Sequence, residues 1–175
     1  MKIKCEAKKN IKLKLILMLI LGLLAIVQPT SLLADEVMLE EKVLIDAPTK
    51  AVWALIGGFK AIDRWHPGVV ASTLLGTGSE IGDIRVLTLN KELSIVEQLE
   101  FYDQNAMTLR YQILESPLPI ANYHATLIAK DAAKGMTEII WKSSFKAVGA
   151  SDEEAKKIIS DIYLAGFESL NDLFN

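Results

Sequence analysis

Arg85 and Glu97 are the two residues of this sequence whose types and spacing best fit recognition of a polar group. If residues 90–92 form a three-residue hairpin loop, the alternation of the flanking strands sets Arg85 opposite Glu97 on a face that is otherwise apolar. An inward-pointing charge is costly unless it is paired. Two interpretations stay open: a structural ion pair, or an anchor in which Arg85 donates to a ligand's carboxylate or carbonyl and Glu97 orients it. A two-residue turn would instead break the pairing and expose one member.

The segment Trp65-His66-Pro67 is the second candidate site. His66 either donates to a ligand or acts as an acid or base, or it is a surface histidine beside a packing tryptophan. His124 is expected to face solvent, because its neighbours Tyr123 and Ala125 belong to the more apolar face of their strand.

Several aromatic residues fall at apolar positions of the expected strands and of the final helix, where they line either a packed core or a pocket. Buried tyrosine hydroxyls need hydrogen-bond partners, so the tyrosines are also candidates for orienting a ligand. Gly166 lies on the apolar stripe of the final helix, where glycine costs about 1 kcal/mol relative to alanine. We therefore expect a strand or a ligand to approach closely there. The aromatic candidates are Tyr111, Tyr123, Trp141, Phe145 and Tyr163.

Several kinds of chemistry are not expected from this composition. The single cysteine, Cys5, precedes a long apolar stretch near the N-terminus, so the rest of the chain has no thiol nucleophile, cysteine-ligated zinc or iron–sulfur cluster. The two histidines, His66 and His124, lie far apart in the sequence. No Ser/His/Asp set, phosphate-binding loop or pair of carboxylates in register is present. We expect no metal and no cofactor, and the sequence leaves open whether the protein is an enzyme.

The first 34 residues have the pattern of a secretory signal peptide. Six lysines between residues 2 and 14 precede an uncharged stretch, Leu15–Val27, and Ala34 is a small residue at a suitable cleavage position. The stretch is shorter than the roughly 20 residues that span a bilayer; an uncleaved anchor is the alternative. We expect a signal peptide over 1–34, a mature domain over 35–175, and a periplasmic or secreted protein that meets the membrane through this segment alone.

The mature domain is acidic. The whole chain has a net charge of −3; without the six lysines and one glutamate of residues 1–34, 13 basic and 21 acidic residues remain, a net charge of −8. A domain of this charge is not expected to bind nucleic acid or an anionic membrane surface. Its length suits one domain with a hydrophobic core.

The expected order of elements is a strand, two short helices, six strands and a long helix. Alternation and turn residues predict strands at 37–45, 69–75, 83–89, 93–101, 107–114, 120–129 and 137–147. The final helix, 151–175, starts with a capping box formed by Ser151 and Glu154. Its apolar stripe comprises Ala155, Ile158, Ile159, Ile162, Tyr163, Gly166, Leu170, Leu173 and Phe174. The fold class is therefore α+β: a curved antiparallel sheet of about seven strands wrapped around a long C-terminal helix, with two short helices after the first strand.

Five segments carry a resemblance to a known superfamily: IDAPTKAVWALIGGF (45–59), RWHPGV (64–69), ESPLPIANY (115–123), IIWKSSF (139–145) and AGFESL (165–170). Over residues 37–174 the chain resembles the START/Bet v 1-like (SRPBCC) helix-grip superfamily, and within it the polyketide cyclase/dehydrase group, which includes the plant abscisic-acid receptors. Secreted members are similar to a periplasmic accessory factor of bacterial methanol oxidation. The resemblance implies an apolar cavity between sheet and helix, and it does not imply catalysis.

These observations predict a periplasmic or secreted binder or carrier of a hydrophobic small molecule. One alternative is a polyketide cyclase- or dehydratase-like enzyme that uses His66, Arg85 and Glu97. Another is an accessory protein whose partner is a periplasmic enzyme, such as a methanol-oxidation-type dehydrogenase.

Overall fold

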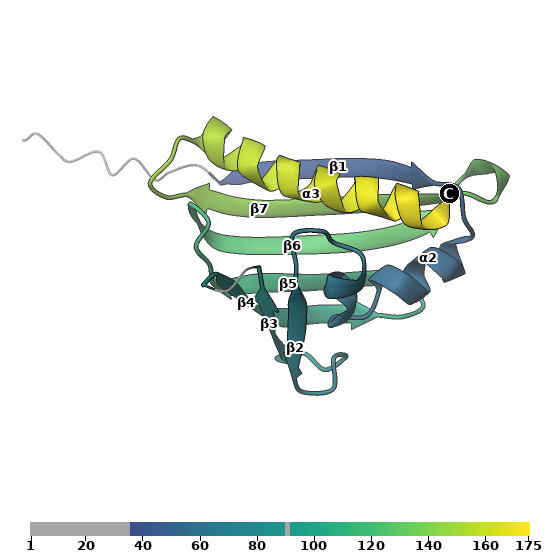
Figure 1. Ribbon diagram of the computed structural model, residues 1–175, viewed down its shortest axis with the longest axis horizontal. Helices are drawn as coiled ribbons and strands as arrows, with labels where there is room; N and C mark the ends of the chain where they lie inside the picture. Colours follow the sequence, from purple (N-terminus) through teal and green to yellow (C-terminus); the bar gives the residue numbers. More distant parts are fainter. Residues whose placement is uncertain (1–35, 90–91) are drawn as a thin grey trace, which may run out of the picture. The chain divides into compact units, whose positions relative to one another are not determined.

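The computed structural model describes residues 36–89 and 92–175. The predicted signal peptide lies outside the described residues. The described chain forms an antiparallel sheet of seven strands in the order β1-β7-β6-β5-β4-β3-β2, and the long helix α3 lies across one face of it, over β1 and β7 (Figure 1). The elements are β1 Val37–Ile45, α2 Thr49–Ile56, η1 Ala61–Arg64, β2 Ala71–Leu75, β3 Ile84–Thr88, β4 Ser94–Asp103, β5 Thr108–Glu115, β6 Ile120–Asp131, η2 Ala133–Gly135, β7 Thr137–Ala147 and α3 Asp152–Phe174.

This architecture confirms the predicted α+β helix-grip fold. The two short helical segments, α2 and η1, follow β1 as expected, and the strands differ from the predicted ranges by at most two residues at either end. The core lies between the inner face of the sheet, α2 and α3, where period-two alternation sends the apolar residues of each strand.

The register of β3 and β4 is the one predicted from a three-residue loop. Arg85 pairs with Glu97, and Leu87 pairs with Ile95. The ladder continues toward the loop through the Leu89 N–H, which donates to the carbonyl of Leu93 at 3.0 Å. Alternation therefore places the charged pair on the inner face of the sheet.

Strands β5 and β6 separate at one end. Their ladder stops at Gln112 and His124, although β5 continues along β4 and β6 begins earlier along β7. Asn122 has a left-handed backbone, with φ of 52°, within a register shift of β6. This irregularity separates the strand ends beside the β5–β6 connection, which carries Leu118, while Tyr123 is buried on the inner face.

Helix α3 begins with the predicted capping box between Ser151 and Glu154. Its buried face differs in part from the predicted stripe. Phe167, which the predicted stripe does not include, is buried, whereas Ile158 and Leu173 are exposed. The buried residues are Ala155, Ile159, Tyr163, Gly166, Phe167 and Leu170. Within the described residues, no helix is both long and apolar enough to span a membrane.

Candidate functional site: a cavity between the sheet and the C-terminal helix

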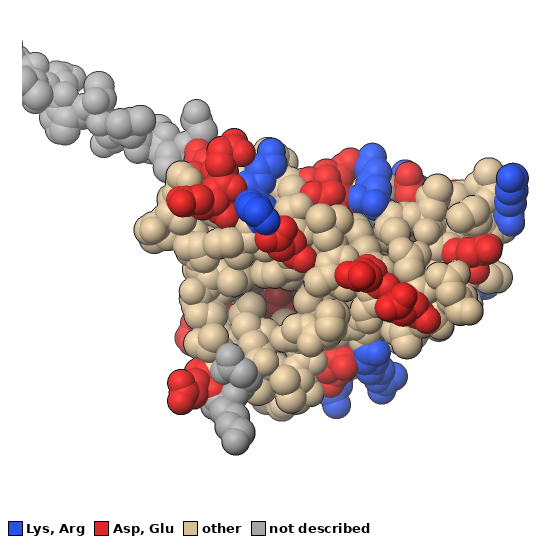
Figure 2. Space-filling view, turned by 45° about the horizontal axis from the view of Figure 1, so that its top comes forward, with Lys and Arg blue, Asp and Glu red and all other residues tan. Residues whose placement is uncertain are grey.

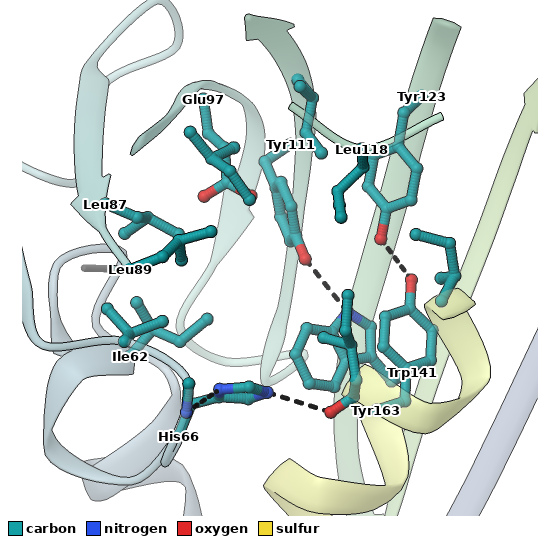
Figure 3. Close-up of a pocket in the computed structure, with 16 residues that line it drawn as sticks. Ile62, His66, Leu87, Leu89, Glu97, Tyr111, Leu118, Tyr123, Trp141 and Tyr163 are labelled. Carbon is teal, nitrogen blue, oxygen red and sulfur yellow. Dashed lines mark hydrogen bonds between the residues drawn. The ribbon is translucent and has the colours of Figure 1, made fainter. Parts of the chain in front are cut away.

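A cavity of about 240 Å³ lies between the inner face of the sheet, the segment after η1 and helix α3 (Figure 3). Most of its lining is aliphatic or aromatic. The lining residues are Ile62, His66, Gly68, Val69, Leu87, Leu89, Ile95, Glu97, Tyr111, Ile113, Leu118, Tyr123, Trp141, Ile159, Ile162 and Tyr163. The space-filling view shows a hollow in the surface with the red atoms of an acidic side chain inside it (Figure 2). Glu97 is the acidic residue among the described lining residues.

Glu97 and Arg85 form the predicted inward-facing pair, with exposures of 4% and 3%. The guanidinium Nε–H donates to Glu97 Oε2, and an Nη1–H donates to the backbone carbonyl of Phe59. The guanidinium carbon lies 4.4 Å from the ring centre of Phe59 and 4.8 Å from that of Tyr111, so aromatic rings also stabilise its charge. Arg85 is thus held by the protein on several sides.

The geometry bears on the interpretation in which Arg85 anchors a ligand, and that interpretation stays a prediction. Glu97 lines the cavity and Arg85 does not. Burial raises the pKa of the Glu97 carboxyl above its ordinary value of 4.5, while the charge and hydrogen bond of Arg85 oppose that rise. The carboxyl group of Glu97 therefore lines the cavity, whereas the guanidinium of its partner Arg85 does not.

His66 joins the segment after η1 to helix α3. Its Nε2–H donates to the carbonyl of Ile162 at 2.9 Å, and its Nδ1 accepts the backbone N–H of Gly68 at 3.1 Å. These two bonds fix the tautomer. Burial lowers the pKa of His66 below 6.5, and the charge of Arg85 adds to this effect, although the Ile162 carbonyl opposes it.

The environment of His66 bears on both of its predicted roles. The residue is 7% exposed, so the surface-histidine interpretation is wrong. Both ring nitrogens are used by the protein's own backbone, so an acid–base role would require breaking one of these bonds.

Other side chains approach the backbone of α3 closely at Gly166, as expected from the sequence. A Cβ atom at this position would lie 2.8 Å from Cδ2 of His66, 2.9 Å from Cζ3 of Trp65 and 3.3 Å from Cζ3 of Trp141. The first two distances are shorter than side chains tolerate. Glycine is therefore required because three aromatic rings pack directly against the helix backbone.

Four aromatic residues form one wall of the cavity (Figure 3). Trp141 stacks on Tyr163 with ring centres 4.1 Å apart, and its Nε1–H donates to the hydroxyl oxygen of Tyr111 at 3.1 Å. The hydroxyls of Tyr123 and Tyr163 are hydrogen-bonded to each other. Burial raises the pKa of all three tyrosines above 10, so they stay protonated at neutral pH. Since the Tyr111 oxygen accepts from Trp141, its own hydrogen remains to be donated.

Comparison with known proteins places this chain among its relatives. The family model described as polyketide cyclase/dehydrase and lipid transport matches residues 36–175. The chain belongs to this family.

Solved structures of similar proteins have the same fold as this member of the polyketide cyclase/dehydrase family. The protein XoxI from Bacillus cereus is 29% identical, with a TM-score of 0.73 over 78% of this chain and 94% of that chain. An uncharacterised protein from Bacillus thuringiensis is 30% identical, with a TM-score of 0.73 over 78% and 98% of the two chains. A protein from Thermobifida fusca is 31% identical, with the same TM-score over 79% and 93%. No curated protein matches. Family and fold together indicate a ligand-binding domain.

The cavity of this family member brings together six of the ten residues proposed from the sequence: His66, Glu97, Tyr111, Tyr123, Trp141 and Tyr163. The other four are buried but are not among the described lining residues: Trp65, Arg85, Phe145 and Gly166. Phe145 supports the wall from behind, since its ring stacks on Tyr123 with centres 6.0 Å apart. Contact of any of these residues with a ligand stays a prediction.

Sequence reasoning missed the aliphatic part of the lining. Leu87, Ile95 and Ile113 share strand faces with residues that were proposed, so alternation alone would have found them. Ile62 and Leu118 lie outside the strands and the long helix, and no periodic signal marks them.

The remaining histidine lies on the outer face, as predicted. His124 Nδ1 is 3.0 Å from Glu100, which is also paired with Arg110. Among the described residues, no group of three or more His, Cys, Asp or Glu side chains could hold a metal ion.

Proposed function

We propose that the protein binds or carries a small hydrophobic molecule in the cavity between the sheet and α3. The observation that supports this function is the lining itself, which is aliphatic and aromatic with a few convergent polar groups. We further propose that the protein acts in the periplasm or outside the cell, because its lysine-rich start and apolar stretch have the pattern of a signal peptide.

The size of the cavity limits the ligand. An apolar cavity of about 150 Å³ holds benzene, so by this scale a cavity of 240 Å³ holds roughly ten non-hydrogen atoms. A compact molecule with one or two rings fits these dimensions. A long-chain lipid would require the cavity to enlarge.

The state of the polar groups favours binding over catalysis. Both nitrogens of His66 are bonded to backbone, and Glu97 is paired with Arg85. The enzyme alternative rests on Glu97, since a buried carboxyl with a raised pKa in a cavity wall is a candidate acid or base. Turnover of the bound molecule that is lost in Glu97→Gln would favour that alternative.

Native mass spectrometry of the domain 35–175, purified from the periplasmic fraction, tests the proposal. The wild-type protein should carry a bound small molecule that is released on unfolding. Leu87→Trp, at a buried lining position, should lose the molecule because the indole ring would fill part of the cavity. Leu44→Trp, the same change at a position 53% exposed on β1, is the matched control and should retain it. No bound molecule in the wild type, or retention by Leu87→Trp, would contradict the proposal.

A further inference from the structure

The charge that the described lining residues present to a ligand is negative or absent. Among its sixteen described lining residues there is no lysine or arginine, and Glu97 is the one carboxylate. His66, the other residue that could carry a positive charge, has a lowered pKa and is neutral at physiological pH. A carboxylate entering the cavity would therefore lose its hydration beside another carboxylate, which is strongly unfavourable.

Arg85 offsets only part of this repulsion, because Glu97, and not the guanidinium, lines the cavity. Its Nε–H and one Nη1–H are donated to Glu97 and to the Phe59 carbonyl, and its guanidinium is flanked by the rings of Phe59 and Tyr111. For a ligand's carboxylate to reach the guanidinium, it would have to displace Glu97, which is 4% exposed. The pair is thus oriented with its negative member toward the cavity.

Glu97 retains capacity to accept a hydrogen bond from a ligand. An ionised carboxylate has about four lone-pair positions, and the bond from Arg85 Nε occupies one of them. A hydrogen bond to a charged group strengthens binding by about 10- to 150-fold, and the bond is stronger where water is excluded. An uncharged ligand with a hydroxyl group can use this acceptor without introducing a second charge.

The electrostatic field of the whole domain also disfavours the entry of anions. The mature chain has a net charge of −8, and the first turn of α3 carries Asp152, Glu153 and Glu154. Anionic molecules are repelled over about a Debye length before they reach the cavity.

We propose that the cavity selects an uncharged ligand with a hydroxyl or similar hydrogen-bond donor, which donates to Glu97, and that it excludes carboxylates of the same size. This inference rests on the proposed function and names the class of ligand for the same site.

Three probes of similar size test the proposal at pH 8, where the high pH and the ion pair with Arg85 both favour the ionised form of Glu97. Para-ethylphenol can donate a hydrogen bond; para-methylanisole is its isomer and can only accept one; para-methylbenzoate is an anion. Each is titrated into the mature protein while the indole N–H signal of Trp141 is followed by NMR. We expect para-ethylphenol to bind at least about tenfold more tightly than either other probe.

The outcomes separate this inference from the proposed function. Equal affinity for para-ethylphenol and para-methylanisole, or binding of para-methylbenzoate as tight as that of para-ethylphenol, would overturn the selection of a neutral donor while leaving the binding function intact. Binding of none of the three, in a protein that also carries no bound molecule, would overturn both.

A variant locates the effect at Glu97. Glu97→Gln should shift the ratio of affinities toward para-methylbenzoate, because the positive charge of Arg85 is then unpaired. Asp161→Asn removes the same charge from an exposed site on α3 and should leave the ratio unchanged. An equal shift in both variants would overturn the role of Glu97 in favour of the overall field. If Glu97→Gln does not fold, the comparison of the three probes in the wild type still decides the proposal.

Discussion

The imidazole ring of His66 occupies the space that a side chain at Gly166 would fill. A Cβ atom there would lie 2.8 Å from Cδ2 of His66, and the ring's Nε2–H donates to Ile162, one helical turn earlier. The absence of a side chain at residue 166 is therefore what lets the loop after η1 bond to the backbone of α3. His66 and Ile162 both line the cavity, so this contact forms part of its wall.

Replacement of Gly166 by leucine should destabilise the protein by about 1–3 kcal/mol, because the added side chain overpacks against Trp65, His66 and Trp141. The better helix propensity of leucine, worth about 1 kcal/mol over glycine, acts in the opposite direction. Urea unfolding measures the net effect. Glu168→Leu, at an exposed position of the same helix, is the control and should change stability little. A gain in stability for Gly166→Leu would show that the close approach does not exist.

The lowered pKa of His66 predicts a dependence of stability on pH. A histidine whose folded-state pKa lies below its unfolded value of 6.5 contributes stability above pH 6.5, and that stability is lost as the pH falls through the folded-state pKa. His66→Gln removes this contribution. The difference in melting temperature between wild type and His66→Gln should therefore change in the wild type's favour as the pH rises to 6.5, and level off above it. A difference that is constant between pH 5 and 8 would contradict the buried, neutral state of His66.

Glu97→Gln should cost on the order of 3–5 kcal/mol of stability, since it leaves the buried charge of Arg85 without its partner. The double variant Arg85→Met with Glu97→Leu should recover much of this loss. Denaturant unfolding of the wild type, both single variants and the double variant gives the coupling energy. An effect below about 1 kcal/mol for the single change would be that of an exposed pair and would contradict the observed burial.

The hydrogen bond between Tyr123 and Tyr163 predicts non-additive effects. Tyr123→Phe should destabilise by about 1–3 kcal/mol, because the hydroxyl of Tyr163 is then buried without this partner. Addition of Tyr163→Phe should cost little more, since the second change removes the unpaired group. A double-mutant cycle by thermal unfolding checks this, and strictly additive losses would argue that the two hydroxyls do not interact.

Processing of the N-terminus is also testable. The lysine-rich start, the apolar stretch Leu15–Val27 and Ala34 predict cleavage after Ala34. N-terminal sequencing of the protein from the soluble periplasmic fraction should begin at Asp35. Recovery of protein with an intact Met1 in the membrane fraction would show that the segment is an anchor.

The sequence predicted those parts of the site that depend on local pattern. Arg85 and Glu97 were paired correctly because alternation along two adjacent strands and the length of one loop determine their register. The inner positions of Tyr111 and Tyr123 followed from the same alternation. In each case the information lies within a hairpin or a single strand.

The parts that sequence did not predict depend on contacts between distant segments. The bond from His66 to Ile162 joins residues 96 positions apart, and nothing near either residue indicates it. The assignment of Glu97, and not Arg85, to the cavity wall depends on the Phe59 carbonyl, 26 residues before Arg85 in the chain. Phe167 is buried and Leu173 is exposed, and helical periodicity alone does not specify which residues beside the apolar stripe the rest of the protein covers.

The most direct test of a small hydrophobic ligand in this cavity is a crystal structure of the mature protein purified from the periplasm without refolding. We expect electron density for a compact molecule between the sheet and α3, in contact with Glu97, Tyr111 and Trp141. Ordered water alone along these side chains, or a collapsed cavity with the ligand bound elsewhere, would contradict it.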